Sequence, residues 1–237
     1  MTDDNMDAKL EHIETSFRDL EQRLKRIREL VELGYIEEAI ILACCAIDSI
    51  ASERYNKDYA SQKDFIDLIS RYSGHQPEFA KISWIFLYKN GKDPSDTTSS
   101  GKPLSGYNQI KTALLERYGN EASDHHQELD KRGIVEYLKR KKLNLDWGNL
   151  EANLDKFSYS AVLYEKYRSR GVHKRSIATK WSAEGKPLFE KNSKGEDIYY
   201  DGNILYFSKE IIMEVLENII RNLKTKCIPK VLFPWEL

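Results

Sequence analysis

The sequence predicts an all-α fold with one small β appendage. Two observations support this prediction. Apolar residues recur at helical spacing along almost the whole chain, and an alternating pattern typical of strands occurs only near residues 186–207. Because apolar periodicity is the primary secondary-structure signal in a single sequence, we expect helices that pack as a bundle around a shared core.

The first predicted helix carries a narrow apolar stripe. Between Leu10 and Val31 the apolar residues lie three or four positions apart, with charged residues between them. This pattern predicts a long helix that packs along one seam and ends before Gly34, because glycine readily follows a last helical turn. Packing on the chain's own domain is favoured over an intermolecular coiled coil at this short length. We therefore expect an N-terminal helix at 1–34, packed on the domain or on a partner, and a helical domain at 35–237.

The next predicted helix is more apolar. Residues 39–47 are all apolar, with small and branched side chains. Such a run can form a buried strand, but its length and its alanines favour a central helix packed on several sides. Asp48 stands at the end of this run, so its carboxylate needs a partner. A structural hydrogen bond is the favoured interpretation of Asp48, and a catalytic role is the alternative.

The later elements follow from periodicity and turn signals. Residues 90–107, rich in Gly, Pro, Ser and Thr, predict an exposed loop and not a domain linker, because helical patterning resumes directly after them. Two turn signals, Lys-Gly and Asp-Gly, predict a small β-hairpin or meander within 186–207. Ser208 is the expected N-cap of a final helix. Helices are predicted at about 61–72, 77–89, 107–118, 124–142, 154–167 and 209–226.

The charge balance limits the classes of partner. The chain carries 37 Lys+Arg against 38 Asp+Glu, which gives a formal net charge of −1. A general polyanion binder is normally strongly basic, so contact with nucleic acid should be confined to a local patch.

The three cysteines indicate a reducing compartment. Cys44 and Cys45 are adjacent in an apolar run and Cys227 is distant, so they do not form a disulfide framework. The acidic N-terminus has no apolar targeting segment, and no apolar run reaches the length that spans a membrane. We therefore expect a cytoplasmic protein that does not bind a membrane.

One short segment concentrates potential metal ligands. Asp124, His125, His126 and Asp130 lie within seven positions. Adjacent histidines point to different faces of a helix, and no further Cys or His occurs at zinc-like spacing, so a solvated helix start is the favoured interpretation. The chain also lacks a Gly-rich phosphate loop, G-x-S-x-G and H-E-x-x-H. The sequence thus predicts no metal and no cofactor.

Two segments concentrate positive charge. Residues 131–142 hold six Lys/Arg and one acid, for which a solvated helix face is the favoured interpretation. Residues 166–180 hold six Lys/Arg, His173 and no acid. An arginine such as Arg168 binds a phosphate through two N–H groups, and a histidine pKa of ~6.5 suits proton transfer in both directions. This second segment therefore contains the groups that phosphodiester chemistry needs.

The order Arg168-Ser169-x-x-x-His173 resembles a known family. It matches the R-[polar]-x(3–5)-H motif of HEPN domains, which are helical bundles. The early apolar helix, the late position of the motif and the β-like stretch before the last helix also resemble that family, over roughly residues 35–225, with 90–150 fitting less closely. Ser169 stands where the family commonly has Asn, Asp or His. Arg175 stands where the branch regulated by AMP transfer has Tyr, so modification at that position is not expected.

The resemblance implies a HEPN-like helical bundle and a metal-independent endoribonuclease in a bacterial toxin or antiviral-defence setting. His173 would act as general acid or base, Arg168 would stabilise charge on the phosphate oxygens, and Ser169 would add a hydrogen bond. The cations at Arg170, Lys174 and Arg175 would hold flanking phosphates without recognising bases. RNA is the expected partner, and an antitoxin or defence-system protein is a further one.

Helix geometry bears on the assembly. Two residues five positions apart on a regular helix are rotated by about 500°, so Arg168 and His173 would point about 140° apart. Either Gly171 interrupts the helix, or a second subunit completes the site, and the resemblance implies a homodimer. Two alternatives to the nuclease remain open: a non-catalytic dimeric helical module that binds RNA or a partner protein, and a structural helical protein whose basic patch is simply solvated.

Overall fold

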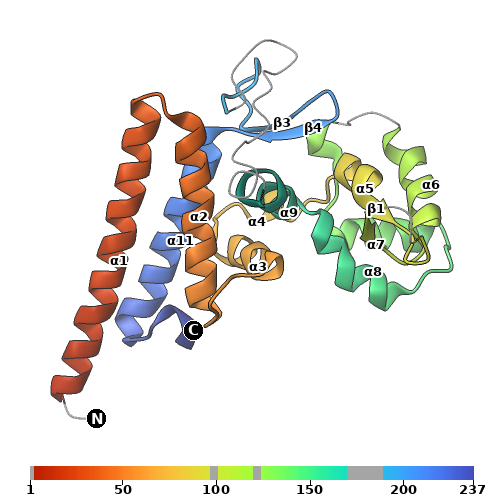
Figure 1. Ribbon diagram of the computed structural model, residues 1–237. Coiled ribbons are helices and arrows are strands. Elements are labelled where there is room, and N and C mark those ends of the chain that lie inside the picture. The colour runs from red at the N-terminus through yellow and green to blue at the C-terminus, as the bar shows by residue number, and fades with distance from the viewer. Residues whose placement is uncertain (1–2, 97–100, 120–123, 170–188) are drawn as a thin grey trace. The chain divides into compact units, whose positions relative to one another are not determined.

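The computed structural model describes residues 3–96, 101–119, 124–169 and 189–237. Within these residues the fold is mainly α, with a long N-terminal helix and two small two-stranded sheets (Figure 1), which confirms the predicted fold class. The chain divides into two compact units, which we call the first unit (Met1–Gln76, Tyr164–Thr179 and Ser208–Leu237) and the second unit (Pro77–Leu163 and Lys180–Phe207). The sequence-based boundary at residue 34 is the turn between two helices of the first unit.

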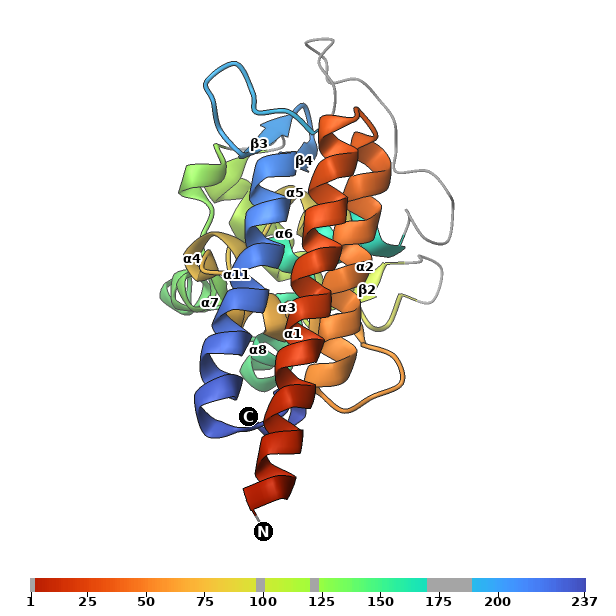
Figure 2. The same cartoon turned by 90° about the vertical axis from the view of Figure 1, so that its left-hand side faces the viewer.

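Three long helices make up most of the first unit: α1 (Asp3–Glu32), α2 (Ile36–Arg54) and α11 (Lys209–Cys227). They lie side by side in two perpendicular views (Figures 1 and 2). The apolar stripe of α1 is buried within this unit, with Ile13 and Phe17 each 1% exposed. Because α2 packs against α1, α3 and α11, its apolar run is covered on several sides, as the sequence predicts.

Local capping explains where the helices of the first unit begin and end. Gly34 has φ +86° after α1, a conformation that glycine adopts without steric cost. Helix α3 (Gln62–Tyr72) starts with a capping box, in which Asp64 N donates to Ser61 Oγ and Ser61 N donates to Asp64 Oδ2. The hydroxyl of Ser208 accepts from Ile211 N and caps α11.

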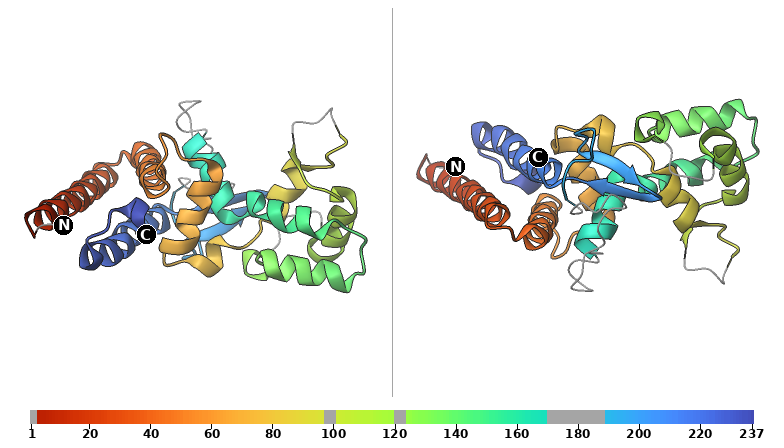
Figure 3. Two further views of the ribbon diagram at one scale, coloured as in Figure 1. Left: turned by 90° about the horizontal axis from the view of Figure 1, so that it is seen from below. Right: turned by 90° about the horizontal axis from the view of Figure 1, so that it is seen from above.

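The last residues of the chain close one end of this bundle. Two short 3₁₀ turns, η4 (Ile228–Lys230) and η5 (Pro234–Glu236), follow α11. Lys9 Nζ near the start of α1 lies 2.8 Å from a carboxylate oxygen of Glu236. The two chain ends therefore lie at the same end of the first unit (Figure 3).

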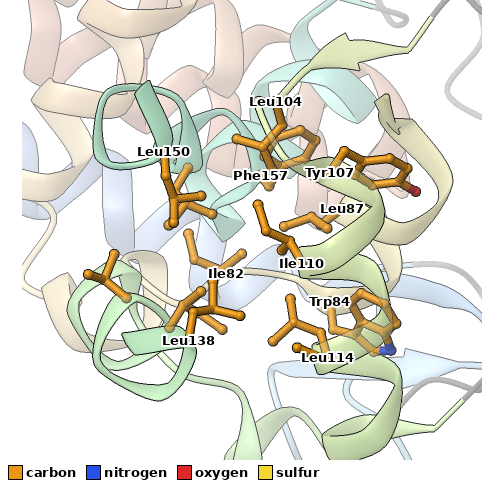
Figure 4. Packing of buried hydrophobic residues seen from close by; sticks show 14 of the residues in the cluster. Ile82, Trp84, Leu87, Leu104, Tyr107, Ile110, Leu114, Leu138, Leu150 and Phe157 are labelled. Carbon is orange, nitrogen blue, oxygen red and sulfur yellow. The ribbon is translucent and has the colours of Figure 1, made fainter. Parts of the chain in front are cut away.

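The second unit has its own core, formed by α5 (Trp84–Asn90), α6 (Tyr107–Tyr118), α7 (Lys131–Arg140) and α8 (Trp147–Asn153). Figure 4 shows how branched and aromatic side chains from these helices and from the segments next to them point toward one another. The labelled members are Ile82, Trp84, Leu87, Leu104, Tyr107, Ile110, Leu114, Leu138, Leu150 and Phe157. Burial of Leu104 means that the predicted loop at 90–107 is exposed only in part.

The helix predicted at 77–89 is in fact two short helices, α4 (Gln76–Phe79) and α5. Between them Lys81 pairs with Asp130 and Ile82 pairs with Ser158 in isolated β-bridges. Backbone groups that form hydrogen bonds with distant segments cannot continue an α-helix. Apolar periodicity alone therefore overestimated the length of the helix here.

Two more predicted helices are shorter than expected, because Asp130 and Ser158, which lie inside them, take part in the same β-bridges. The segment 124–142 forms a 3₁₀ turn, η1 (His125–Gln127), and then α7, which is capped by Asp130. The segment 154–167 forms η2 (Leu154–Phe157), α9 (Tyr159–Leu163) and the π-helical turn η3 (Tyr164–Ser169). Helix α8 was not predicted.

The β structure is slightly more extensive than predicted. Strands β3 (Ile198–Asp201) and β4 (Ile204–Phe207) form the expected antiparallel hairpin, with Gly202 at φ +55° in its turn. Strands β1 (Gly91–Lys92) and β2 (Lys102–Pro103) add a parallel pair that the sequence did not indicate. None of the helices described is long and apolar enough to cross a membrane.

Candidate functional site

Arg168 and Asp48 form an ion pair inside the first unit. Arg168 lies in the π-helical turn η3, and Asp48 lies in α2. The guanidinium donates to Oδ2 of Asp48 from Nη2 at 2.8 Å and from Nε at 3.2 Å. Their side chains are 19% and 14% exposed, so water competes weakly for these hydrogen bonds. The hydrogen-bonding partner expected for the Asp48 carboxylate is therefore Arg168.

Aromatic rings support the guanidinium. The Arg168 guanidinium carbon lies 5.5 Å from the centre of the Tyr164 ring, within the range of a cation–π contact. Tyr164 packs edge-on against Phe65 of α3, with ring centres 5.2 Å apart. A carboxylate and an aromatic ring thus both constrain Arg168. The π-helical turn that carries it is a rare element found frequently at functional sites.

The carboxylate of Asp48 keeps the Arg168 guanidinium charged. Burial lowers the pKa of Arg168, but the hydrogen bond and the charge of Asp48 outweigh it and leave that pKa raised. Oδ1 of Asp48 is buried and has no hydrogen-bond partner among the residues that the structure describes. A buried carboxylate oxygen without a partner is costly, and such atoms often mark a place where another group binds.

Cys45 lies one turn before Asp48 on α2 and is half-buried. Burial raises the pKa of its thiol, and the nearby Arg168 offsets only part of that increase. The thiol is therefore protonated near neutral pH and is not an activated nucleophile. Cys45 also lines a cavity of about 280 Å³ between α1 and α2, together with Arg23, Arg26 and apolar side chains such as Leu42.

Most of the other predicted site residues cannot be placed. Ser169 is the last residue of η3. Arg170, His173, Lys174 and Arg175 lie outside the described residues. Their proposed roles, and the question of whether Gly171 interrupts a helix, stay predictions.

The earlier basic segment, 131–142, is a solvated face, as predicted. Its cations pair with acids at the surface: Arg132 lies 2.9 Å from Glu136 and Lys141 lies 2.7 Å from Glu116. Exposed pairs of this kind contribute little to stability.

No match to a known protein was found. No family model matches the chain, and neither a curated protein nor a solved structure matches it. The resemblance to HEPN domains therefore rests on the motif and on the order of elements.

A second polar cluster lies in the core of the second unit. Glu128 is 4% exposed and accepts hydrogen bonds from Trp84 N at 2.6 Å, Tyr159 Oη at 2.5 Å and Tyr200 Oη at 3.0 Å. Ser83 Oγ lies 2.7 Å from Tyr200 Oη and extends the network. Burial raises the pKa of Glu128 to about 7, although the hydrogen bonds oppose it. Because the partners all come from the same core, we interpret this cluster as structural.

The prediction that the adjacent histidines diverge is wrong. His125 and His126 lie in the 3₁₀ turn η1, and their ring centres are 3.8 Å apart. The α-helix geometry on which the prediction relied does not apply, because α7 begins only at Lys131.

Sequence reasoning missed several of these groups. Tyr164 and Cys45 gave no signal of their own, since aromatic and thiol side chains on apolar helix faces are usually core residues. Glu128 stood within a predicted helix among other polar residues, and nothing in the local sequence indicated that Trp84, Tyr159 and Tyr200 would enclose it. Asp48 was recognisable from its position after an apolar run.

Proposed function

We propose that the protein is a HEPN-type endoribonuclease that cleaves RNA through the RNA's own 2′-hydroxyl, without a metal ion. The observation that carries the proposal is the ion pair between Arg168 and Asp48. The pair holds the motif arginine against α2 in a mainly helical unit, which is what a phosphate-binding arginine needs if it is to be oriented before substrate arrives.

The chemistry needs a base, an acid and charge stabilisation. A base removes the 2′-hydroxyl proton, the 2′-oxygen attacks phosphorus, and the bond from phosphorus to the 5′-oxygen breaks as an acid protonates that oxygen. His173 supplies one of these proton transfers, and a second copy of the same histidine across the expected twofold axis supplies the other. The products are a 2′,3′-cyclic phosphate and a 5′-hydroxyl, and DNA resists because it lacks the nucleophile.

The cationic groups stabilise and position the phosphates. Arg168 stabilises charge that develops on the non-bridging oxygens, and Ser169 contributes a hydrogen bond next to it. The cations at Arg170, Lys174 and Arg175 hold the flanking phosphates without contacting bases. Asp48 fixes the plane of the Arg168 guanidinium and is a positioning residue, since it acts through the arginine.

The setting follows from the resemblance. We place the enzyme in the cytoplasm, as a homodimer in a bacterial toxin or antiviral-defence system, with an antitoxin or defence protein as a further partner. The buried, unpaired thiols of Cys44 and Cys227 fit a reducing compartment.

The test is cleavage of labelled single-stranded RNA in the presence of EDTA. Wild type should release fragments that end in a 2′,3′-cyclic phosphate, and His173→Ala should remove most of this activity. Arg168→Lys should also lose most activity, because a point charge does not replace a planar two-pronged donor. Arg132→Lys is the matched control, since Arg132 lies on a solvated face and is paired with Glu136.

Two outcomes would overturn the proposal. Equal cleavage by wild type and by His173→Ala would identify a contaminating nuclease. No cleavage by wild type across varied RNAs would favour the alternative, a non-catalytic dimeric module that binds RNA or a partner protein.

A further inference from the structure

Three potential metal ligands converge at η1 in the second unit. Asp124, His125 and His126 each place one ligand atom within 4.8 Å of the other two. Asp124 Oδ1 lies 3.8 Å from His125 Nδ1, and the two imidazole centres are 3.8 Å apart. In the part of the chain that the structure describes, this is the one group of three or more such residues with this spacing.

A fourth group reaches the cluster from a distant part of the same unit. Glu196, in the loop before β3, places Oε1 3.2 Å from Nε2 of His126. Glu196 is itself held by Asn192, whose Oδ1 accepts from Glu196 N at 2.9 Å. The carboxylate is thus positioned either to bind an ion directly or to orient the imidazole, as carboxylates commonly do for metal-bound histidines.

The backbone that carries the histidines is held by hydrogen bonds within the turn and by the core on its C-terminal side. Asp124 Oδ1 accepts from His126 N at 3.0 Å, and Asp124 O accepts from Gln127 N at 2.9 Å. The next residue, Glu128, is hydrogen-bonded in the core of the unit. A ligand set on an anchored turn loses little conformational entropy when an ion binds.

The distances suit a small transition-metal ion. Bonds of about 2.0–2.2 Å to nitrogen and oxygen in a tetrahedral site place the ligand atoms about 3.3–3.6 Å apart. Glu196 Oε1 lies 3.2 Å from His126 Nε2 and Asp124 Oδ1 lies 3.8 Å from His125 Nδ1, both close to that range. The ligand atoms of Asp124, His125 and His126 lie within 4.8 Å of one another, so binding requires side-chain rotations that bring them closer together. Imidazole nitrogens with carboxylate oxygens are ligands that zinc accepts readily, whereas magnesium and calcium prefer oxygen alone.

We infer that Asp124, His125 and His126, together with Glu196, form a zinc site in the second unit. The ion links the 3₁₀ turn η1 to the loop before β3 and stabilises this unit. It takes no part in the RNA cleavage proposed above, for which no metal is needed. The result of the zinc-binding test therefore does not depend on whether the protein cleaves RNA.

The test is direct zinc binding to metal-free, untagged protein by isothermal titration calorimetry. Wild type should bind one Zn²⁺ per chain, and saturating Zn²⁺ should raise its Tm, because an ion that binds only the folded state stabilises it. His126→Ala should weaken the affinity by at least about tenfold, and Glu196→Gln by about tenfold. Circular dichroism on each variant checks that the fold is retained.

The matched control is His75→Ala. His75 Nε2 lies 3.1 Å from Glu214 Oε1, which makes a single histidine–carboxylate pair without a second imidazole from a neighbouring residue. This variant should bind zinc like wild type, and so should Cys45→Ser, which tests for capture by a thiol. Binding that is unchanged in the double variant His125→Ala/His126→Ala, or binding of Mg²⁺ in preference to Zn²⁺, would overturn the inference.

Discussion

Arg168 and Asp48 lie 120 positions apart in the chain, yet two N–H groups of the guanidinium donate to one oxygen of the carboxylate. Two donors on one planar group restrict both the position and the rotation of that plane. A substrate phosphate would therefore meet an arginine whose orientation is set before binding. This relationship connects the most apolar helix of the first unit to the start of the basic segment.

Removal of the carboxylate should destabilise the protein. Asp48→Ala leaves a cation that is 19% exposed without its carboxylate, so we expect a loss of about 2–3 kcal/mol in the free energy of unfolding, somewhat less than for a fully buried pair. Urea denaturation measures this change. Glu116→Ala, which breaks an exposed pair with Lys141, should leave the urea midpoint nearly unchanged. Similar midpoints for the two variants would contradict a structural role for Asp48.

The buried network around Glu128 should be a major source of stability in the second unit. Glu128→Ala leaves Trp84 N and the hydroxyls of Tyr159 and Tyr200 without their acceptor, at a cost of about 3 kcal/mol or more. Tyr200→Phe removes one hydroxyl and should cost about 1 kcal/mol. Thermal and urea unfolding should show a larger loss of stability for Glu128→Ala than for Tyr200→Phe. The ranking would be refuted if Tyr200→Phe were the more damaging change.

Stability should fall in acid, in part because of Asp64. Burial raises the pKa of this carboxyl, but the hydrogen bonds from Lys57 and Ser61 outweigh it, so the pKa in the folded state is lower than the ordinary value of 3.8. The unfolded chain therefore takes up the proton first as the pH falls. The stabilisation is fully present only well above the ordinary value of 3.8, and it is lost as the pH falls from that value through the folded pKa. Urea titrations between neutral pH and pH 3 should show that the free energy of unfolding falls less for Asp64→Asn than for wild type. An identical dependence on pH in the two proteins would exclude this contribution.

The basic segment should determine how RNA binding depends on salt. Each of Lys174→Ala and Arg175→Ala removes one expected phosphate contact, so the plot of log affinity against log salt should become shallower by about 0.7 for single-stranded RNA. Fluorescence anisotropy at several salt concentrations measures the slope. Lys139→Ala, on the solvated face of α7, should leave it unchanged. If all three variants keep the wild-type slope, residues 174 and 175 do not contact phosphates.

The assembly is testable separately from the chemistry. The HEPN resemblance predicts a homodimer whose twofold axis brings the two copies of His173 together. Light scattering at micromolar concentration should give twice the chain mass of 27.7 kDa. A monomer under these conditions would remove the partner that completes the proposed site.

The sequence alone predicted most of the regular structure. The spacing of apolar residues predicted α1, α2, α3, α6 and α11, and the cap at Ser208 and the turn glycines predicted where elements begin and end. These features depend on residues within one or two turns of each other, so local physical chemistry decides them. The partial exceptions, at 77–89, 124–142 and 154–167, are the places where the backbone pairs with distant segments.

The tertiary structure decided which distant groups meet. The sequence indicated that Asp48 needs a partner but could not name Arg168, and it gave no sign that Glu196 approaches His126 or that Glu128 is buried. The physical reason is that hydrogen bonds and ion pairs act over a few ångströms in space, whatever the separation along the chain. Which side chains come that close depends on how the helices and loops of each unit pack, and a single sequence carries no direct record of that packing.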